Sequence, residues 1–167
     1  ISNLPKSNTV GEWNKMEIVD TPNTHTIDEL CKFLGISSSI IVKTLVYIVD
    51  KKPVIALIRG DKQVEETKLL NAVGGIEIRP ATAGEIIEML EVNGFKSEAG
   101  FIGPKGLKEY NGYEITFVAD KTIVELKNFV VGINENDKHM VGANLEDLEL
   151  SEIKYIELSQ LKNIQKK

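Results

Sequence analysis

Two apolar runs rich in β-branched residues lie close together in the first third of the chain, and they constrain the fold more than any other feature. They are Ile40–Val49 and Val54–Arg59, separated by the four residues Asp50-Lys51-Lys52-Pro53. Runs of this kind on either side of a short polar stretch predict a β-hairpin. Neither face of the first run is polar, so we expect other elements to cover both faces of the hairpin.

Capping signals predict the helices that accompany this hairpin. Thr26 and Glu29 have the spacing of a capping box, and apolar residues follow at helical spacing until Gly35. Thr82 and Glu85 repeat the pattern before a second apolar helical segment. A shorter helix is predicted over residues 65–71.

The remaining apolar runs predict further strands. They lie at residues 76–79, 115–119, 129–133 and 140–143, and the tail at 153–158 predicts a final strand or helix. Because strands and helices do not alternate regularly, the sequence predicts a mixed α/β (α+β) fold. We expect a largely antiparallel or mixed, barrel-like sheet flanked by helices.

Length and composition limit the class of protein. The 167 residues predict one domain, 1–167, with residues 1–18 as an approach or linker segment and 19–167 as the core. The net charge of −5 argues against an independent, non-specific nucleic-acid binder, but it is compatible with a domain that touches only the tip of an RNA. No apolar run reaches the roughly 18 residues of a membrane helix.

The start of the chain and its single cysteine suggest a cellular setting. The first residues lack the apolar region of a signal peptide, and the missing initiator Met fits a piece of a longer chain. Cys31 is alone, so no disulfide can form within the chain, and a reducing, cytoplasmic location is expected.

Lys43 lies in the middle of the first apolar run and is the first candidate functional residue. Side chains alternate along a strand, so Lys43 shares a face with Ile41, Leu45 and Tyr47. One interpretation is a lysine at a sheet edge that reaches water. The other is an ammonium that projects into a cleft, where it donates hydrogen bonds to a phosphate, a carbonyl or a developing oxyanion.

Three further features could belong to a site. The segment AGFIGPKGL, Ala99–Leu107, is a glycine-rich loop that would let a ligand approach the backbone closely, or an ordinary connection. Asp120 follows an apolar run and is a candidate cap or functional carboxylate, and His139 is a lone histidine. No other ligand lies near His139 at metal spacing, so neither a metal nor a cofactor is predicted.

Taken in order, these segments resemble one known family. They are TPNTHTIDELCKFLG, IVKTLVYIVD, ALIRGDKQVEETKL, GFIGPKGL and VADKTIVELKNFVVGINENDKHMVGAN. The series is similar to the editing domain inserted in bacterial-type prolyl-tRNA synthetase, a member of the YbaK-like aminoacyl-tRNA deacylases. The resemblance covers roughly residues 17–147.

The resemblance implies an enzyme that hydrolyses the ester between a wrong amino acid and tRNA, with Ala-tRNA(Pro) as substrate. Its partners would be the tRNA acceptor end and the remainder of the synthetase, with no cofactor and no membrane. The implied catalytic residues are Lys43, Gly100, Gly103 and Pro104. The implied substrate-binding residues are Ile27, Leu30, Phe101, Ile102, Asp120 and His139.

Two alternatives stay open at this point. The chain could be a non-catalytic tRNA-binding or regulatory module that has kept the fold and lost the reaction. It could also be a free-standing deacylase of the same superfamily that acts on another substrate, such as Cys-tRNA(Pro).

Overall fold

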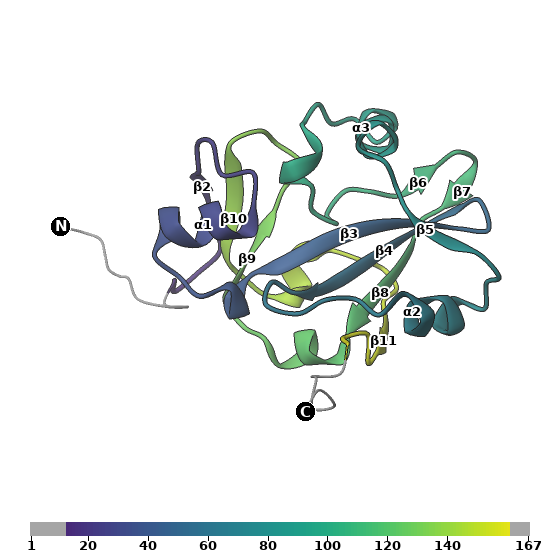
Figure 1. Cartoon of the computed structure of the whole chain (residues 1–167). Helices are drawn as coiled ribbons and strands as arrows, with labels where there is room; N and C mark the ends of the chain where they lie inside the picture. The colour runs from purple at the N-terminus through teal and green to yellow at the C-terminus, as the bar shows by residue number, and fades with distance from the viewer. Residues whose placement is uncertain (1–12, 161–167) are drawn as a thin grey trace.

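The computed structural model describes residues 13–160 and contains two main sheets with helices packed around them (Figure 1). The helices are α1 Ile27–Leu34, α2 Glu66–Val73 and α3 Ala83–Val92. The strands are β2 Glu17–Asp20, β3 Val42–Val49, β4 Lys52–Arg59, β5 Ile78–Pro80, β6 Glu109–Tyr110, β7 Tyr113–Glu114, β8 Thr116–Asp120, β9 Phe129–Gly132, β10 Lys138–Ala143 and β11 Lys154–Ile156.

The strand pairing is mixed, which confirms the predicted fold class. The larger sheet has the order β11-β8-β4-β3-β5, in which β8 runs parallel to both β4 and β11 and the other pairs are antiparallel. A three-stranded antiparallel sheet has the order β2-β10-β9. A single bridge between Ile41 and Val130 connects the two sheets.

The predicted hairpin is present, but its turn is shorter than expected. Asp50 and Lys51 alone form the turn, with φ angles of 49° and 76°, while Lys52 and Pro53 already belong to β4. Two successive residues with positive φ form a turn whose twist matches that of the flanking strands, so the ladder extends to the pair Val49–Lys52.

Both predicted capping boxes are present. The Thr26 hydroxyl accepts a hydrogen bond from the Glu29 N–H, Glu29 bonds back to the Thr26 N–H, and Gly35 ends α1 with a φ of 70°. Thr82 and Glu85 form the same pair of bonds at the start of α3.

Two elements were not expected from the sequence. β2 begins at Glu17, at the end of the predicted approach segment, and the β6–β7 hairpin turns at Asn111-Gly112 in a stretch without apolar alternation. Residues 1–12 of the approach segment and the lysine-rich end, 161–167, lie outside the described residues. The tail forms a strand, β11, as one of its two predicted alternatives.

The central hairpin is covered on both faces, as expected. On one face, Val42, Val46 and Leu57 pack with Met89 and Leu90 of α3. On the other face, Tyr47, Ala56 and Ile58 pack with Leu69 of α2 and with Leu158 from the C-terminal segment. Figure 1 shows α3 and α2 on opposite sides of the sheet. Among residues 13–160, no helix has both the length and the apolar character needed to cross a membrane.

Two glycines hold the glycine-rich loop against β9 at very short range. A Cβ atom on Gly103 would overlap the backbone of Gly132, and a Cβ on Gly132 would overlap the carbonyl oxygen of Ile102. Neither neighbour is a flexible side chain that could move aside. The loop therefore requires glycine at both positions.

Substituting Gly103→Ala should lower the free energy of unfolding by about 3 kcal/mol or more, because the new methyl group must displace backbone. Chemical denaturation measures this loss. Gly84→Ala in α3 is the matched control, because a Cβ there would meet only the Thr82 hydroxyl oxygen, at an ordinary contact distance of 3.9 Å. This substitution should be stabilising by up to about 1 kcal/mol. Equal stability of the Gly103→Ala variant and the parent chain would contradict the predicted overlap.

Candidate functional site

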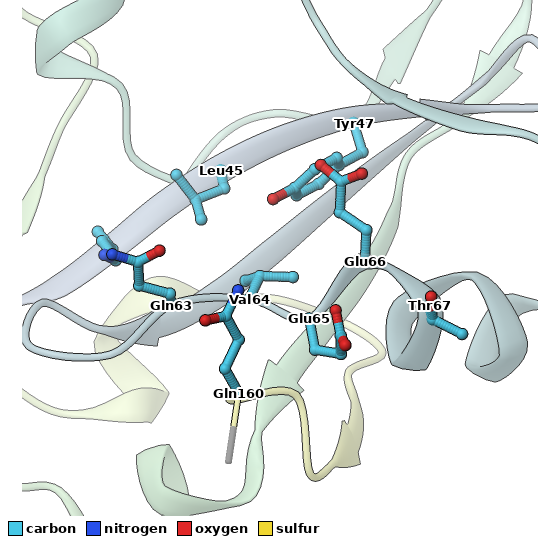
Figure 2. Close-up of a pocket in the computed structure, with 9 residues that line it drawn as sticks. Leu45, Tyr47, Gln63, Val64, Glu65, Glu66, Thr67 and Gln160 are labelled. Carbon is cyan, nitrogen blue, oxygen red and sulfur yellow. The ribbon is translucent and has the colours of Figure 1, made fainter. Parts of the chain in front are cut away.

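Lys43 projects from β3 into a hollow at the start of α2. The hollow has a volume of about 490 Å³. Its lining residues, drawn in Figure 2, are Lys43, Leu45, Tyr47, Gln63, Val64, Glu65, Glu66, Thr67 and Gln160. β3 lies between β4 and β5 in the sheet order. β5 pairs with β3 only at Tyr47–Val49, so at Lys43 the strand is paired with β4 alone. Lys43 thus faces the hollow from a stretch of β3 that has one strand neighbour.

The Lys43 ammonium has no hydrogen bond or ion pair with any residue in the described part of the chain, 13–160. Partial burial lowers its pKa from the ordinary value, and the nearby Asp61 carboxylate opposes that shift. Asp61 is itself held by Arg59, whose Nε and Nη2 donate to it at 2.9 and 2.5 Å. These bonds lower the pKa of Asp61 and keep it charged.

Most backbone N–H groups of the glycine-rich loop are already hydrogen-bonded within the protein. Phe101 N–H donates to Glu98 O at 3.2 Å and Ile102 N–H to Ala99 O at 3.3 Å. Gly103 N–H donates to the side-chain oxygen of Asn134 at 2.8 Å, and Pro104 has no N–H. Of the four residues 100–103, only Gly100 keeps an N–H without a partner among residues 13–160, and Gly100 is exposed.

His139 is buried beside this loop and ties it to the segment before α1. The residue is 5% exposed, and its Nδ1 lies 2.7 Å from the Thr21 hydroxyl oxygen. The Phe101 ring packs between two imidazoles, with centroids 5.1 Å from His25 and 5.8 Å from His139. Burial lowers the pKa of His139 from 6.5 to about 4, so the ring is neutral near pH 7.

The N-terminus of α1 lies between the glycine-rich loop and the central hairpin. A Cβ on Gly100 would lie 3.2 Å from the carbonyl oxygen of His25, and a Cβ on Gly60, just after β4, would lie 3.5 Å from Cγ2 of Ile27. Ile27 is only partly buried, whereas Leu30 is 2% exposed and packs in the core. Ile27 is thus the residue of this predicted pair that remains accessible to a ligand.

Asp120 is buried and anchors the C-terminal segment. Its Oδ1 accepts hydrogen bonds from the N–H groups of Leu158 at 2.7 Å and Ser159 at 3.2 Å, and its Oδ2 accepts from Thr122. Burial raises the pKa of Asp120, but the bonds from Thr122 and the C-terminal backbone outweigh it, so the net pKa is lowered. Next to this anchor, Gln160 N–H donates to Gln63 O at 2.9 Å and forms one wall of the hollow.

The structure thus divides the predicted residues into groups. Lys43 lines the hollow, and none of Gly100–Pro104 does. The glycine-rich loop lies next to His139, on the side of the α1 N-terminus away from the central hairpin. Its residue Ile102 packs against the core. Asp120 does not line the hollow itself, but it anchors the C-terminal segment that carries Gln160.

Sequence reasoning missed several residues of the site. Gln63–Thr67 lie in the segment ALIRGDKQVEETKL, from which no site residue was predicted, and Gln160 lies beyond the resemblance. Asn134, which holds Gly103, lies in a polar turn. Tyr47 was recognisable, because it alternates onto the face of Lys43. Among the described residues 13–160, no group of three or more His, Cys, Asp or Glu side chains is placed to hold a metal ion.

Comparison with known proteins gives the family. A model of the aminoacyl-tRNA editing domain matches residues 21–150. The chain belongs to this family. This membership agrees with the motif series and extends over most of the described chain.

Curated relatives of this editing domain are proline–tRNA ligases. The chain is 41% identical over 138 residues to the ligase of Streptococcus gordonii and 42% identical over 143 residues to that of Aquifex aeolicus. These matches cover 83% and 84% of the chain but only 21% and 24% of the ligases. The chain therefore spans less than a quarter of the length of these relatives.

Solved structures share the fold. A candidate trans-editing enzyme for prolyl tRNA synthetase has a TM-score of 0.71 at 21% identity, over 87% of each chain. A hypothetical protein has a TM-score of 0.73 at 22% identity, over 87% of this chain and 92% of its own.

The burial of His139 predicts a pH dependence of stability. The unfolded chain binds a proton near pH 6.5 and the folded chain only near pH 4, so stability falls as the pH drops through this window. Over that window the parent chain should lose about 3 kcal/mol more unfolding free energy than a His139→Gln variant. Denaturation curves at several pH values measure the difference, and parallel pH profiles would contradict the lowered pKa.

Proposed function

We propose that this editing domain hydrolyses the ester of mischarged tRNA(Pro), with Ala-tRNA(Pro) as substrate, as the domain inserted in a prolyl-tRNA synthetase. The family and the proline–tRNA ligase relatives support this assignment. The tRNA acceptor end would then enter the site while the remainder of the synthetase binds the tRNA body. The observation that carries the proposal is the half-buried Lys43 ammonium, which faces a hollow without a partner among residues 13–160.

The hydrolysis does not require a strong nucleophile, because an aminoacyl ester is already reactive. Water attacks the carbonyl carbon, a tetrahedral oxyanion forms, and the bond to the ribose oxygen breaks as that oxygen takes up a proton. Lys43 donates a hydrogen bond to the carbonyl oxygen as its negative charge develops. Gly103 and Pro104 keep the glycine-rich loop in place beside the α1 N-terminus, and the Gly100 N–H of that loop lies outside the Lys43 hollow.

The pocket for the amino acid would be formed at the N-terminus of α1. Ile27 lies close to Gly60 and remains accessible, so its branched side chain can limit the size of the bound amino acid. Alanine fits such a pocket and proline does not, so the editing site would select the wrongly attached amino acid by its smaller size. His139 contributes indirectly, because it fixes Thr21 and the Phe101 ring around this pocket.

Replacing Lys43 with Ala should reduce deacylation of Ala-tRNA(Pro) by about 100-fold or more, because a donor to the oxyanion is lost. The substitution is tolerable for the fold, since it removes a charge from a partly buried site. Lys108→Ala, at an exposed lysine, is the matched control and should leave deacylation unchanged. A folded Lys43→Ala variant with turnover near that of the parent chain would exclude the proposed role.

Replacing Ile27 with Ala should enlarge the pocket and raise deacylation of Pro-tRNA(Pro) relative to Ala-tRNA(Pro) by about 10-fold or more. Ile87→Ala, which shortens a more exposed isoleucine of α3, should leave the ratio unchanged. A panel of Ala-, Cys- and Pro-charged tRNA measures this specificity. An unchanged ratio would remove Ile27 from the sieve, and turnover on none of the three would favour the non-catalytic binding module.

A further inference from the structure

The hollow in front of Lys43 contains two more polar groups without a partner. Tyr47 is 7% exposed, yet its phenol oxygen has no hydrogen bond with any residue between 13 and 160, and it lies on the wall of the hollow. Figure 2 shows this oxygen on the side of the ring toward Leu45, with the Glu66 carboxylate near the same ring. Glu66 also has no hydrogen bond or ion pair through its carboxylate within that range. Both groups face the hollow and can hydrogen-bond to a ligand that enters it.

Lys43 lies at one end of the hollow, and Tyr47 and Glu66 lie at the other. Lys43 and Tyr47 are four residues apart on the same face of β3, which places their Cα atoms about 13 Å apart. Leu45 lies between them on that face, and Val64 lines the hollow opposite. The hollow therefore has a cationic end, an apolar middle and an end with a phenol and a carboxylate.

The phenol and the carboxylate offer one donor beside one acceptor. Burial raises the pKa of Tyr47 and the charge of Glu66 raises it further, so the phenol stays protonated and can donate. The Glu66 carboxylate can only accept. The Watson–Crick edge of adenine has the complementary pattern, with N1 as acceptor beside the N6 amino donor.

We propose that Tyr47 and Glu66 form a subsite for the adenine base of the 3′-terminal nucleoside of the tRNA, which rests on the proposed function. Tyr47 donates to N1, Glu66 accepts from the N6 amino group, and Leu45 and Val64 contact the base. The ribose then extends along the hollow toward Lys43, which reaches the ester. Guanine and uracil present a carbonyl where Glu66 needs a donor, so the subsite disfavours them.

The test compares two alanylated tRNA substrates that differ only at the 3′-terminal base. One ends in adenosine, and the other ends in purine riboside, which keeps N1 but lacks the N6 amino group. The parent chain should deacylate the second about 10- to 100-fold less efficiently, mainly through a higher KM. Glu66→Leu, which removes the acceptor, should lose most of this discrimination, and Tyr47→Phe should raise KM for both substrates.

Two matched substitutions serve as controls. Tyr113→Phe removes a hydroxyl from an exposed tyrosine of β7, and Glu77→Leu removes the carboxylate from an exposed glutamate. Both should retain the full discrimination between the two substrates. Equal deacylation of both substrates by the parent chain, or unchanged discrimination in the Glu66→Leu variant, would overturn the subsite and leave the proposed function intact.

A binding measurement separates the subsite from the reaction. The parent chain should bind adenosine 5′-monophosphate more tightly than purine riboside 5′-monophosphate, and Glu66→Leu, which lacks the acceptor, should bind the two alike. If no charged tRNA is deacylated, the proposed hydrolysis fails, and this base preference alone then decides whether the subsite exists. Equal binding of both nucleotides by the parent chain would overturn it.

Discussion

Burial of the central β-hairpin on both faces is the constraint on which the rest of the structure depends. The apolar side chains of β3 and β4 have α3 on one side and α2 on the other, so almost every position along them is enclosed. A charged residue in such a strand costs free energy unless it has a partner or reaches water. Lys43 meets this condition at a stretch where the cover opens into a hollow. The same packing that stabilises the fold thus leaves this ammonium group half-buried and facing that hollow.

Two further contacts hold the surroundings of this hollow in place. Gly103 and Gly132 bring the glycine-rich loop against β9, and Asn134 fixes the loop by accepting from the Gly103 N–H. Asp120 anchors the segment at Leu158, which leads to the wall at Gln160. Residues with implied functional roles can therefore act without touching the substrate, because they position the parts that do.

The sequence was sufficient for much of the fold, because local signals and burial agreed. The capping boxes at Thr26 and Thr82 and the two runs of the hairpin each formed the predicted element. β2 and the β6–β7 hairpin were missed, since short strands at a sheet edge need little apolar alternation. The site was harder to predict. Lys43 was visible as a charge in an apolar strand, but Gln160 reaches it through tertiary packing that no local pattern contains.

The central claim is that the Lys43 ammonium is partly desolvated and meets the ester of the bound substrate. Nuclear magnetic resonance of the labelled lysine nitrogens tests it directly, with a tRNA acceptor-end analogue in which a stable amide replaces the ester. Lys43 should titrate below the ordinary value of 10.5 in the free chain, and the analogue should raise its pKa. An ordinary pKa that does not respond to the analogue would contradict the account.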